Sequence, residues 1–200
     1  LDSSLCKLKI GSVSFNAFGH EVVFYASKKG FDIFLDLKLH DIPNTVKKSI
    51  EGLKSLPISM ITLHTSGGIK MMQSAMDAVK GSKIKIFGVT ALTSLSDDDT
   101  NQIYQRDASS QVNAMLDLAE ESGIDGVVCS PHELNLVSKR VGLLSITPGI
   151  RLVNTDDDQS RVMTPKQAIE LGADYLVIGR PITASDDISA SLKEIYKSIQ

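Results

Sequence analysis

The sequence has few of the features that mark membrane, secreted or nucleic-acid-binding proteins. Its two cysteines, Cys6 and Cys129, form no CxxC pair and lie in apolar segments, so we expect buried free thiols and a reducing, cytoplasmic compartment. No apolar run approaches the roughly 20 residues that span a bilayer. The net charge of −3 provides no excess of basic residues to attract nucleic acid or a membrane surface. We therefore expect neither kind of partner.

The motifs of several common chemistries are also missing. The sequence has no His-x-x-x-His, no cluster of metal ligands, no Walker loop and no supportable Ser-His-Asp arrangement. These patterns give no reason to expect a metal site or a nucleotide-binding loop of that type.

The chain alternates predicted strands and helices without a break in composition. Its 200 residues, 42% hydrophobic and 22% charged, suit one domain covering residues 1–200. Apolar residues at helical spacing follow the strands, as at Phe15, Phe18, Val22 and Tyr25. Residues 96–110 are instead expected to form a polar loop, whose acidic run Asp97-Asp98-Asp99 either caps a helix or faces solvent. The predicted strands are 6–10, 33–39, 58–65, 83–92, 126–129, 143–146 and 175–178.

Polar and glycine residues gather after the last apolar residue of the predicted strands. An open doubly wound sheet would also explain the alternation of strands and helices. Polar residues confined to the carboxyl ends of the strands are more typical of a (β/α)8 TIM barrel. Such a barrel needs eight strands, and we expect the missing first strand to precede Leu1, because the chain enters a strand almost at once.

The segment 33–39 carries charges on one face of its predicted strand. Side chains alternate between the two faces of a strand, so Asp36 and Lys38 point the same way, opposite an aliphatic face. Asp41 follows where the strand should end, and Pro43 suits the first turn of a helix. A structural ion pair would explain Asp36 and Lys38 alone, because buried charges need partners. Three charges at one strand end favour a catalytic site.

A lysine at this position can act as a nucleophile or as an acid. A Schiff base at Lys38, or at the strand-end residue Lys9, would need a neutral amine. The acids close to Lys38 favour its protonated form. Lys38 therefore suits proton donation to a carbanion better than amine attack.

Gly179 and Arg180 follow the last predicted strand, where barrels often bind phosphate. Glycine lets a backbone N–H approach an oxyanion, and arginine supplies a bidentate fork. A plain turn would also explain Gly-Arg, but Arg151 and the polar loop after it (152–162) favour a phosphate site.

The sequence from Asp36 to Thr45 resembles the D-x-K-x-x-D-I-P-N-T signature of the bacterial orotidine 5′-phosphate decarboxylase family. D-x-K-x-x-D alone is shared with related sugar-phosphate decarboxylases, whereas the Ile-Pro-Asn-Thr extension is specific to the family. The resemblance covers almost the whole chain, through the blocks Leu8-Lys9-Ile10-Gly11, His64-Thr65-Ser66-Gly67-Gly68, Val89-Thr90-Ala91-Leu92-Thr93-Ser94, Thr147-Pro148-Gly149-Ile150-Arg151 and Val177-Ile178-Gly179-Arg180-Pro181.

The resemblance implies a carbon–carbon lyase that converts orotidine 5′-phosphate to UMP and CO2 without a cofactor, the last step of de novo pyrimidine nucleotide biosynthesis. Lys38 would protonate C6 of the pyrimidine, and Asp36 would lie against the substrate carboxylate. Lys9, Asp36, Lys38 and Asp41 would form an alternating charge network. In a homodimer with shared active sites, Asp41 would come from the second subunit, and Thr45 would cross the interface with it. The other implied contacts are Lys9 in the charge network, Thr93 at the base, and Arg151, Gln159, Gly179 and Arg180 at the phosphate.

One departure from the family concerns the ribose. The family carries an Ala-Leu-Asp strand upstream whose Asp binds the ribose, but Asp2 lies too close to Lys9 to match it.

Two alternative functions stay open. A metal-dependent sugar-phosphate decarboxylase or aldolase on the same barrel would lose activity in EDTA. A non-catalytic nucleotide-phosphate binder would bind UMP-like ligands without releasing CO2.

Overall fold

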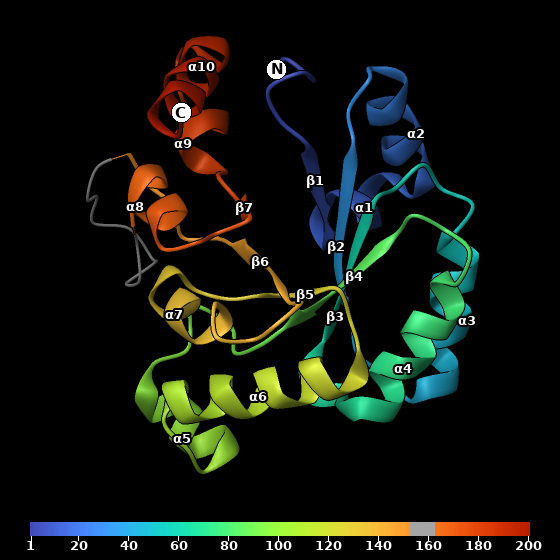
Figure 1. Ribbon diagram of the computed structural model, residues 1–200. Helices are drawn as coiled ribbons and strands as arrows, with labels where there is room; N and C mark the ends of the chain where they lie inside the picture. The colour runs from blue at the N-terminus through green and yellow to red at the C-terminus, as the bar shows by residue number, and fades with distance from the viewer. Residues whose placement is uncertain (153–162) are drawn as a thin grey trace.

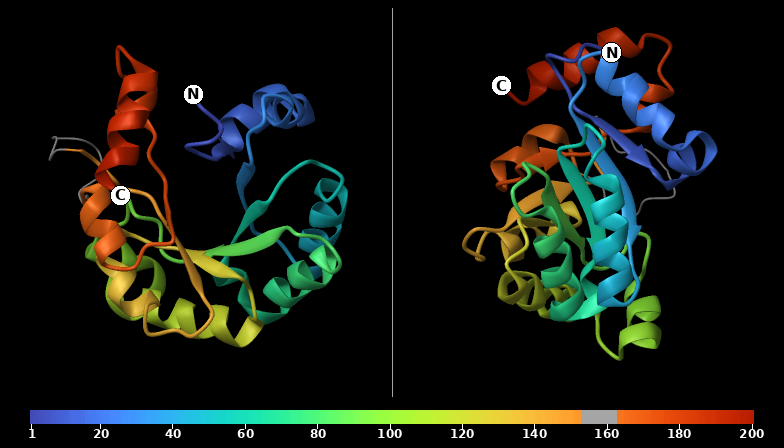
Figure 2. Two further views of the ribbon diagram at one scale, coloured as in Figure 1. Left: turned by 45° about the horizontal axis from the view of Figure 1, so that its top comes forward. Right: turned by 90° about the vertical axis from the view of Figure 1, so that its right-hand side faces the viewer.

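A parallel sheet of seven strands, paired in sequence order, forms the centre of the computed structural model, which describes residues 1–152 and 163–200. The sheet curls strongly, with β1 and β7 at its two edges (Figure 2). The strands are β1 (Leu8–Gly11), β2 (Ile33–Leu39), β3 (Met60–His64), β4 (Lys85–Val89), β5 (Gly126–Val128), β6 (Leu144–Thr147) and β7 (Tyr175–Leu176).

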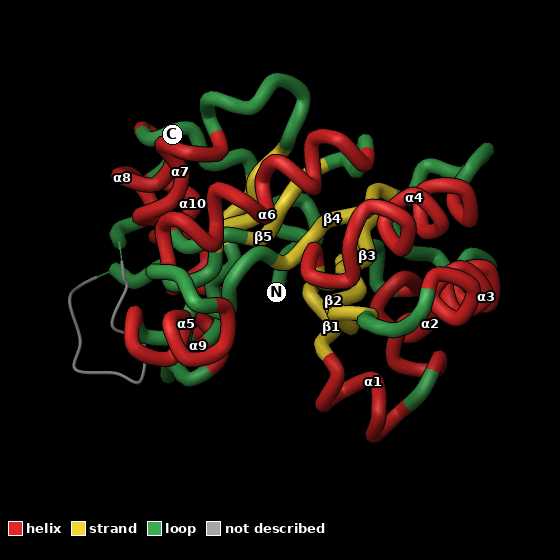
Figure 3. Tube along the Cα trace, turned by 90° about the horizontal axis from the view of Figure 1, so that it is seen from below, coloured by secondary structure: helices red, strands yellow, loops and turns green. Residues whose placement is uncertain are grey.

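The helices lie around the outside of the curled sheet (Figures 1 and 3). None of the helices in residues 1–152 and 163–200 is long and apolar enough to cross a membrane. The helices are α1 (Ser12–Phe18), α2 (His20–Lys28), α3 (Pro43–Leu53), α4 (Gly68–Val79), α5 (Asp97–Tyr104), α6 (Ala108–Ser122), α7 (Leu134–Val137), α8 (Pro165–Glu170), α9 (Arg180–Thr183) and α10 (Ile188–Ser198), with the 3-10 turns η1 (Thr65–Gly67) and η2 (Pro131–Glu133).

This architecture confirms the predicted TIM-barrel-like fold. The open side of the sheet, between β1 and β7, is where an eighth strand would complete a barrel. That such a strand precedes Leu1 stays a prediction. Leu5 and Cys6, just before β1, pack against a buried cluster of Ile182, Leu192 and Ile195 from α9 and α10, so the two ends of the described chain lie together.

Strand β2 shows how the sheet uses both of its faces. Ile33 and Leu35 are fully buried in the main core, as the predicted aliphatic face requires. Phe34 points to the other face and belongs to a second buried cluster, with Met60, Phe87 and Ile146 from neighbouring strands. This second cluster fills the interior of the curled sheet, below the carboxyl ends of the strands.

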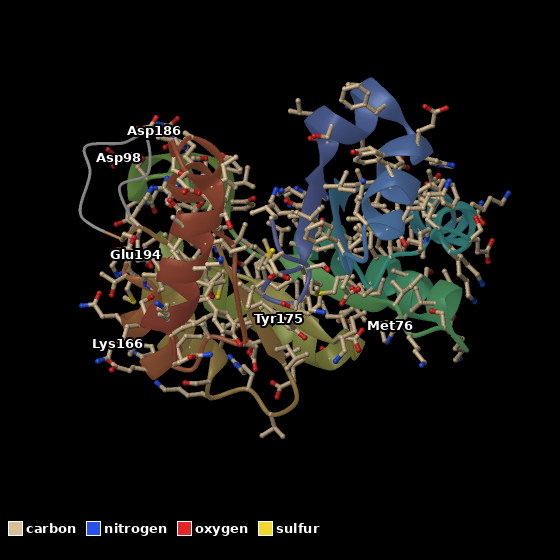
Figure 4. The ribbon with its side chains drawn as sticks, turned by 90° about the horizontal axis from the view of Figure 1, so that it is seen from above. Met76, Asp98, Lys166, Tyr175, Asp186 and Glu194 are labelled. Atoms are coloured by element: carbon tan, nitrogen blue, oxygen red, sulfur yellow. The ribbon has the colours of Figure 1, made fainter. Side chains whose placement is uncertain are left out.

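Phe87 is fully buried and meets the ring of Tyr175 edge to face, with ring centroids 6.2 Å apart. Figure 4 places Tyr175 towards the centre of the molecule, whereas Lys166 and Asp98 lie at its periphery. The interior contact therefore joins β4 to β7, which the sheet ladder does not pair directly.

A recurring glycine–residue–aspartate sequence fixes the amino ends of the strands. Gly123 ends α6 with a positive φ of 75°, which a side chain rarely adopts. Two residues later, the Asp125 carboxylate accepts the Ile86 N–H at 2.8 Å. Asp174 accepts the Ser145 N–H at 2.8 Å in the same way. Side chains thus tie the amino edge of the sheet together and leave the carboxyl edge for a binding site.

Two predicted elements differ from the structure. The helix expected around residues 15–25 is interrupted at Gly19 (φ 57°, ψ −144°), which separates α1 from α2. The expected polar loop at 96–110 is wrong, because it contains α5 and the start of α6. Ser96 and Asp99 form a capping box that satisfies the first N–H groups of α5, and acidic residues favour a helix start.

Candidate active site

A cavity of about 430 Å3 opens at the carboxyl ends of the strands. Its volume is in the range of small-molecule sites. The side chains of Phe34, Val128 and Ile146 supply apolar lining from the sheet interior. Seven of the residues predicted for the site line the same cavity: Lys9, Asp36, Lys38, Thr93, Arg151, Gly179 and Arg180.

Asp36 is the centre of a charge array within this cavity. It is 8% exposed. Lys38 Nζ donates to Asp36 Oδ1 at 2.9 Å and to Oδ2 at 2.8 Å. Lys9 Nζ reaches Oδ2 from the neighbouring strand β1 at 3.2 Å. The predicted pairing of Asp36 with Lys38 is therefore present, and Lys9 joins it.

The array determines the charge state of Asp36. Burial by itself would raise the pKa of this carboxyl, because it disfavours the ionised form. The hydrogen bond from Lys38, the charges of Lys9 and Lys38, and a hydrogen bond from Thr62 outweigh burial and lower the pKa below its usual value. Asp36 is therefore a carboxylate between two cationic side chains at neutral pH.

The backbone at Lys38 is unusual. Lys38 has a φ of 52°, in the left-handed region that L-residues with side chains rarely occupy. The register between β2 and β3 shifts between Leu35 and Leu39, so Lys38 lies in an irregular part of the ladder. Backbone strain of this kind is common at functional sites.

Thr62 is a site residue that sequence reasoning missed. It lies in the middle of β3, and its hydroxyl contacts both Asp36 and the Lys38 backbone. A polar threonine among the apolar residues 60–63 was the available signal, but strands accept threonine so readily that the pattern indicated only a strand.

Two arginines from the later strand ends line the same cavity. Arg151 is 7% exposed and donates from Nη1 to the Ile150 carbonyl. Arg180 begins α9 directly after Gly179. An alanine-type Cβ at Gly179 would meet nothing within 4 Å, so the backbone there is open to a ligand. Gln159, also predicted for the phosphate, lies outside the described residues.

Asp41 and Thr45 do not belong to this cavity within one chain. Both side chains are exposed, and the Asp41 carboxylate accepts the Ile42 N–H at 2.6 Å. The neighbouring Ile42 is 67% exposed. The structure thus brings together three of the four residues predicted for the charge network, and that Asp41 serves a second subunit stays a prediction.

His64 lies at the carboxyl end of β3, with its ring centroid 5.3 Å from that of His40. Burial, and then the charges of His40 and Lys38, lower the pKa of His64. No group of three His, Cys, Asp or Glu side chains that could hold a metal ion occurs in residues 1–152 and 163–200.

Comparison with known proteins agrees with this geometry. The sequence matches the model of the family described as "Orotidine 5′-phosphate decarboxylase / HUMPS family" over residues 1–195. It is 47% identical over 195 residues to an orotidine 5′-phosphate decarboxylase of Wolbachia pipientis subsp. Culex pipiens, covering 96% of this chain and 86% of the relative. Against the enzyme of that name from Saccharophagus degradans it is 45% identical over 201 residues, covering 98% and 84%.

A solved structure shows the same fold. The crystal structure of orotidine 5′-phosphate decarboxylase from Lactobacillus acidophilus superimposes with a TM-score of 0.84 at 38% identity, covering 96% of this chain and 86% of the other. The chain therefore belongs to the orotidine 5′-phosphate decarboxylase family.

Proposed function

We propose that the protein catalyses the decarboxylation of orotidine 5′-phosphate to UMP and CO2, the last step of de novo pyrimidine nucleotide biosynthesis, without a cofactor. The observation that carries this proposal is the Lys9–Asp36–Lys38 array, placed in the same cavity as Arg151 and Arg180. The charge array suits a reacting carboxylate, and the two arginines suit a phosphate.

The reaction breaks the bond between C6 of the pyrimidine and the carboxylate. CO2 leaves, and the electron pair of the broken bond stays on C6 as a carbanion. The Lys38 ammonium then transfers a proton to C6, which gives UMP, and the neutral amine regains its proton from solvent. Lys38 stabilises the transition state because its positive charge faces the negative charge that develops at C6.

Asp36 acts on the substrate carboxylate. Its low pKa keeps it ionised, so a substrate carboxylate bound beside it meets another negative charge. This repulsion falls as CO2 departs, which lowers the barrier relative to the bound substrate. Lys9 and Lys38 hold Asp36 in place, because both donate hydrogen bonds to it.

The phosphate is bound by the cationic part of the cavity. Arg151, Arg180 and the backbone at Gly179 supply the donors, together with Gln159, and Thr93 contacts the pyrimidine. Binding energy from a phosphate remote from C6 can organise the charge array around the reacting carboxylate.

The active site is shared between two subunits of a homodimer. Asp41 lies just after β2 and Thr45 lies in the first turn of α3; both side chains are exposed, and neither lines the cavity of its own chain. In the dimer Asp41 completes the charge network of the partner, and Thr45 enters the same site beside it.

A spectrophotometric assay for the loss of orotidine 5′-phosphate tests the proposal. Lys38→Ala is expected to lower turnover by at least about 1,000-fold, because it removes the proton donor. Lys7→Ala is the matched control, since Lys7 pairs with Asp32 on the surface and is expected to keep wild-type turnover. Turnover is expected to persist in EDTA. Near-normal turnover of Lys38→Ala would refute the mechanism.

Mixing inactive subunits tests the shared site. Lys38→Ala and Asp41→Ala homodimers are each expected to be inactive, but one site of the mixed dimer holds both intact groups. Partial recovery of activity on mixing is therefore expected. No recovery, with subunit exchange demonstrated by a mass tag, would place Asp41 outside the partner's site.

A further inference from the structure

The pairing of β2 with β3 is interrupted beside the charge array. Leu35 pairs with Ile61 and Leu39 pairs with Leu63, so three residues of β2 lie opposite one residue of β3, Thr62. Regular ladder bonds cannot form across this irregular stretch. The Thr62 hydroxyl accepts the Lys38 N–H at 2.9 Å in place of a backbone carbonyl.

The same hydroxyl also binds the carboxylate. Thr62 Oγ1 donates to Asp36 Oδ1 at 2.9 Å, and the Thr62 side chain has no solvent exposure. A hydroxyl has one proton to donate and lone pairs to accept. Since the proton is committed to Asp36 and a lone pair to Lys38, both contacts have a defined direction.

We propose that Thr62 is a positioning residue that holds the Asp36 carboxylate and the left-handed backbone of Lys38 in the geometry required for decarboxylation. The inference rests on the proposed function. Thr62 does not line the cavity and so acts through its two neighbours. A shift of a catalytic group by a fraction of an ångström slows the chemical step even though the substrate still binds.

The test compares Thr62→Val, which keeps the shape and removes the hydroxyl, with Thr62→Ser, which keeps the hydroxyl. For Thr62→Val we expect kcat to fall roughly 10- to 100-fold, as for the loss of a hydrogen bond to a charged group, with KM and UMP binding nearly unchanged. Thr62→Ser is expected to recover most of kcat. A matched control is Thr65→Val, in the 3-10 turn η1 directly after the same strand, which removes an equally buried hydroxyl that donates to the Val89 carbonyl.

The pH profile separates positioning from a loss of stability. Burial raises the pKa of Asp36, and the Thr62 hydroxyl is one of the groups that lower it. In Thr62→Val the acid limb of the kcat/KM profile is therefore expected to move to higher pH, and in Thr65→Val it is expected to stay in place.

The outcomes distinguish this inference from the proposed function. If the wild-type protein does not decarboxylate orotidine 5′-phosphate, the proposed function fails. The role of Thr62 is overturned, and the proposed function stands, if the wild type is active and Thr62→Val has the wild-type kcat and pH profile. The same conclusion follows if Thr65→Val lowers kcat as much as Thr62→Val does. If Thr62→Val does not fold, Thr62→Cys, with its weaker donor, replaces it. A wild-type kcat in that variant overturns the role.

Discussion

The left-handed backbone of Lys38 leads to a prediction about stability. Lys38→Ala and Lys38→Gly both remove the amine, so both are expected to lose turnover. They differ in what they do to a residue with a φ of 52°. Glycine adopts this conformation without a steric penalty, whereas alanine carries a Cβ that clashes there.

The size of the difference follows from two opposing terms. Left-handed backbone costs a residue with a side chain roughly 1–2 kcal/mol. Glycine loses about 0.4–1 kcal/mol more conformational entropy than alanine on folding. We therefore expect Lys38→Gly to be more stable than Lys38→Ala by about 1 kcal/mol, which corresponds to about 2–4 °C in Tm for a chain of this size.

Thermal unfolding followed by circular dichroism, at one protein concentration, measures this difference. Lys85 at the start of β4 provides the control, because it lies in a regular strand and its backbone has no positive φ. There the order should reverse, with Lys85→Gly less stable than Lys85→Ala by about 0.5–1 kcal/mol. If Lys38→Gly is no more stable than Lys38→Ala while the Lys85 pair behaves as expected, the left-handed backbone does not store strain in solution.

Two further predictions concern groups outside the charge array. Cys129 has no solvent exposure, and burial raises the pKa of its thiol to about 12. It should therefore resist a thiol-specific reagent in the native protein and react in denaturant, whereas Cys6 should react faster in the native protein. Equal reaction rates of the two thiols in the native protein would contradict the burial of Cys129. His64 has a lowered pKa in the folded protein. As the pH falls through its unfolded pKa of about 6.5, the unfolded chain binds a proton more readily than the folded protein, so the free energy of unfolding should fall. Urea titrations between about pH 5 and 7 should show a weaker pH dependence for His64→Gln, and an unchanged slope would rule out this contribution.

Much of the site could be anticipated from local pattern. Asp36 and Lys38 are two residues apart in a strand, so alternation alone places them on one face. Glycines and arginines after the strands mark the carboxyl edge of a parallel sheet, where ligands bind. The expected loop at 96–110 failed for a local reason, because Ser96 and the following acids can cap a helix as well as face solvent.

Thr62 could not be identified in this way. Its role depends on the register between β2 and β3, which is set by how the buried side chains of the two strands pack. A threonine in or beside a strand has the same local signature whether its hydroxyl bonds to a charge array, as at Thr62, or to a carbonyl, as at Thr65 directly after β3. The contact between Thr62 and Asp36 is also hard to predict from local sequence, because the two residues are 26 positions apart.

The amino-acid sequence by itself determined the alternation of strands and helices, the face that carries Asp36 and Lys38, and the residues available at the strand ends, because these follow from periodicities of a few residues. Only the tertiary structure decided that Lys9 from β1 and Thr62 from β3 converge on Asp36. It also decided that the Lys38 backbone adopts a left-handed conformation, and that Arg151 and Arg180 line the same cavity as the charge array. These features depend on strand register and on the curl of the sheet, which arise from packing between segments distant in the chain.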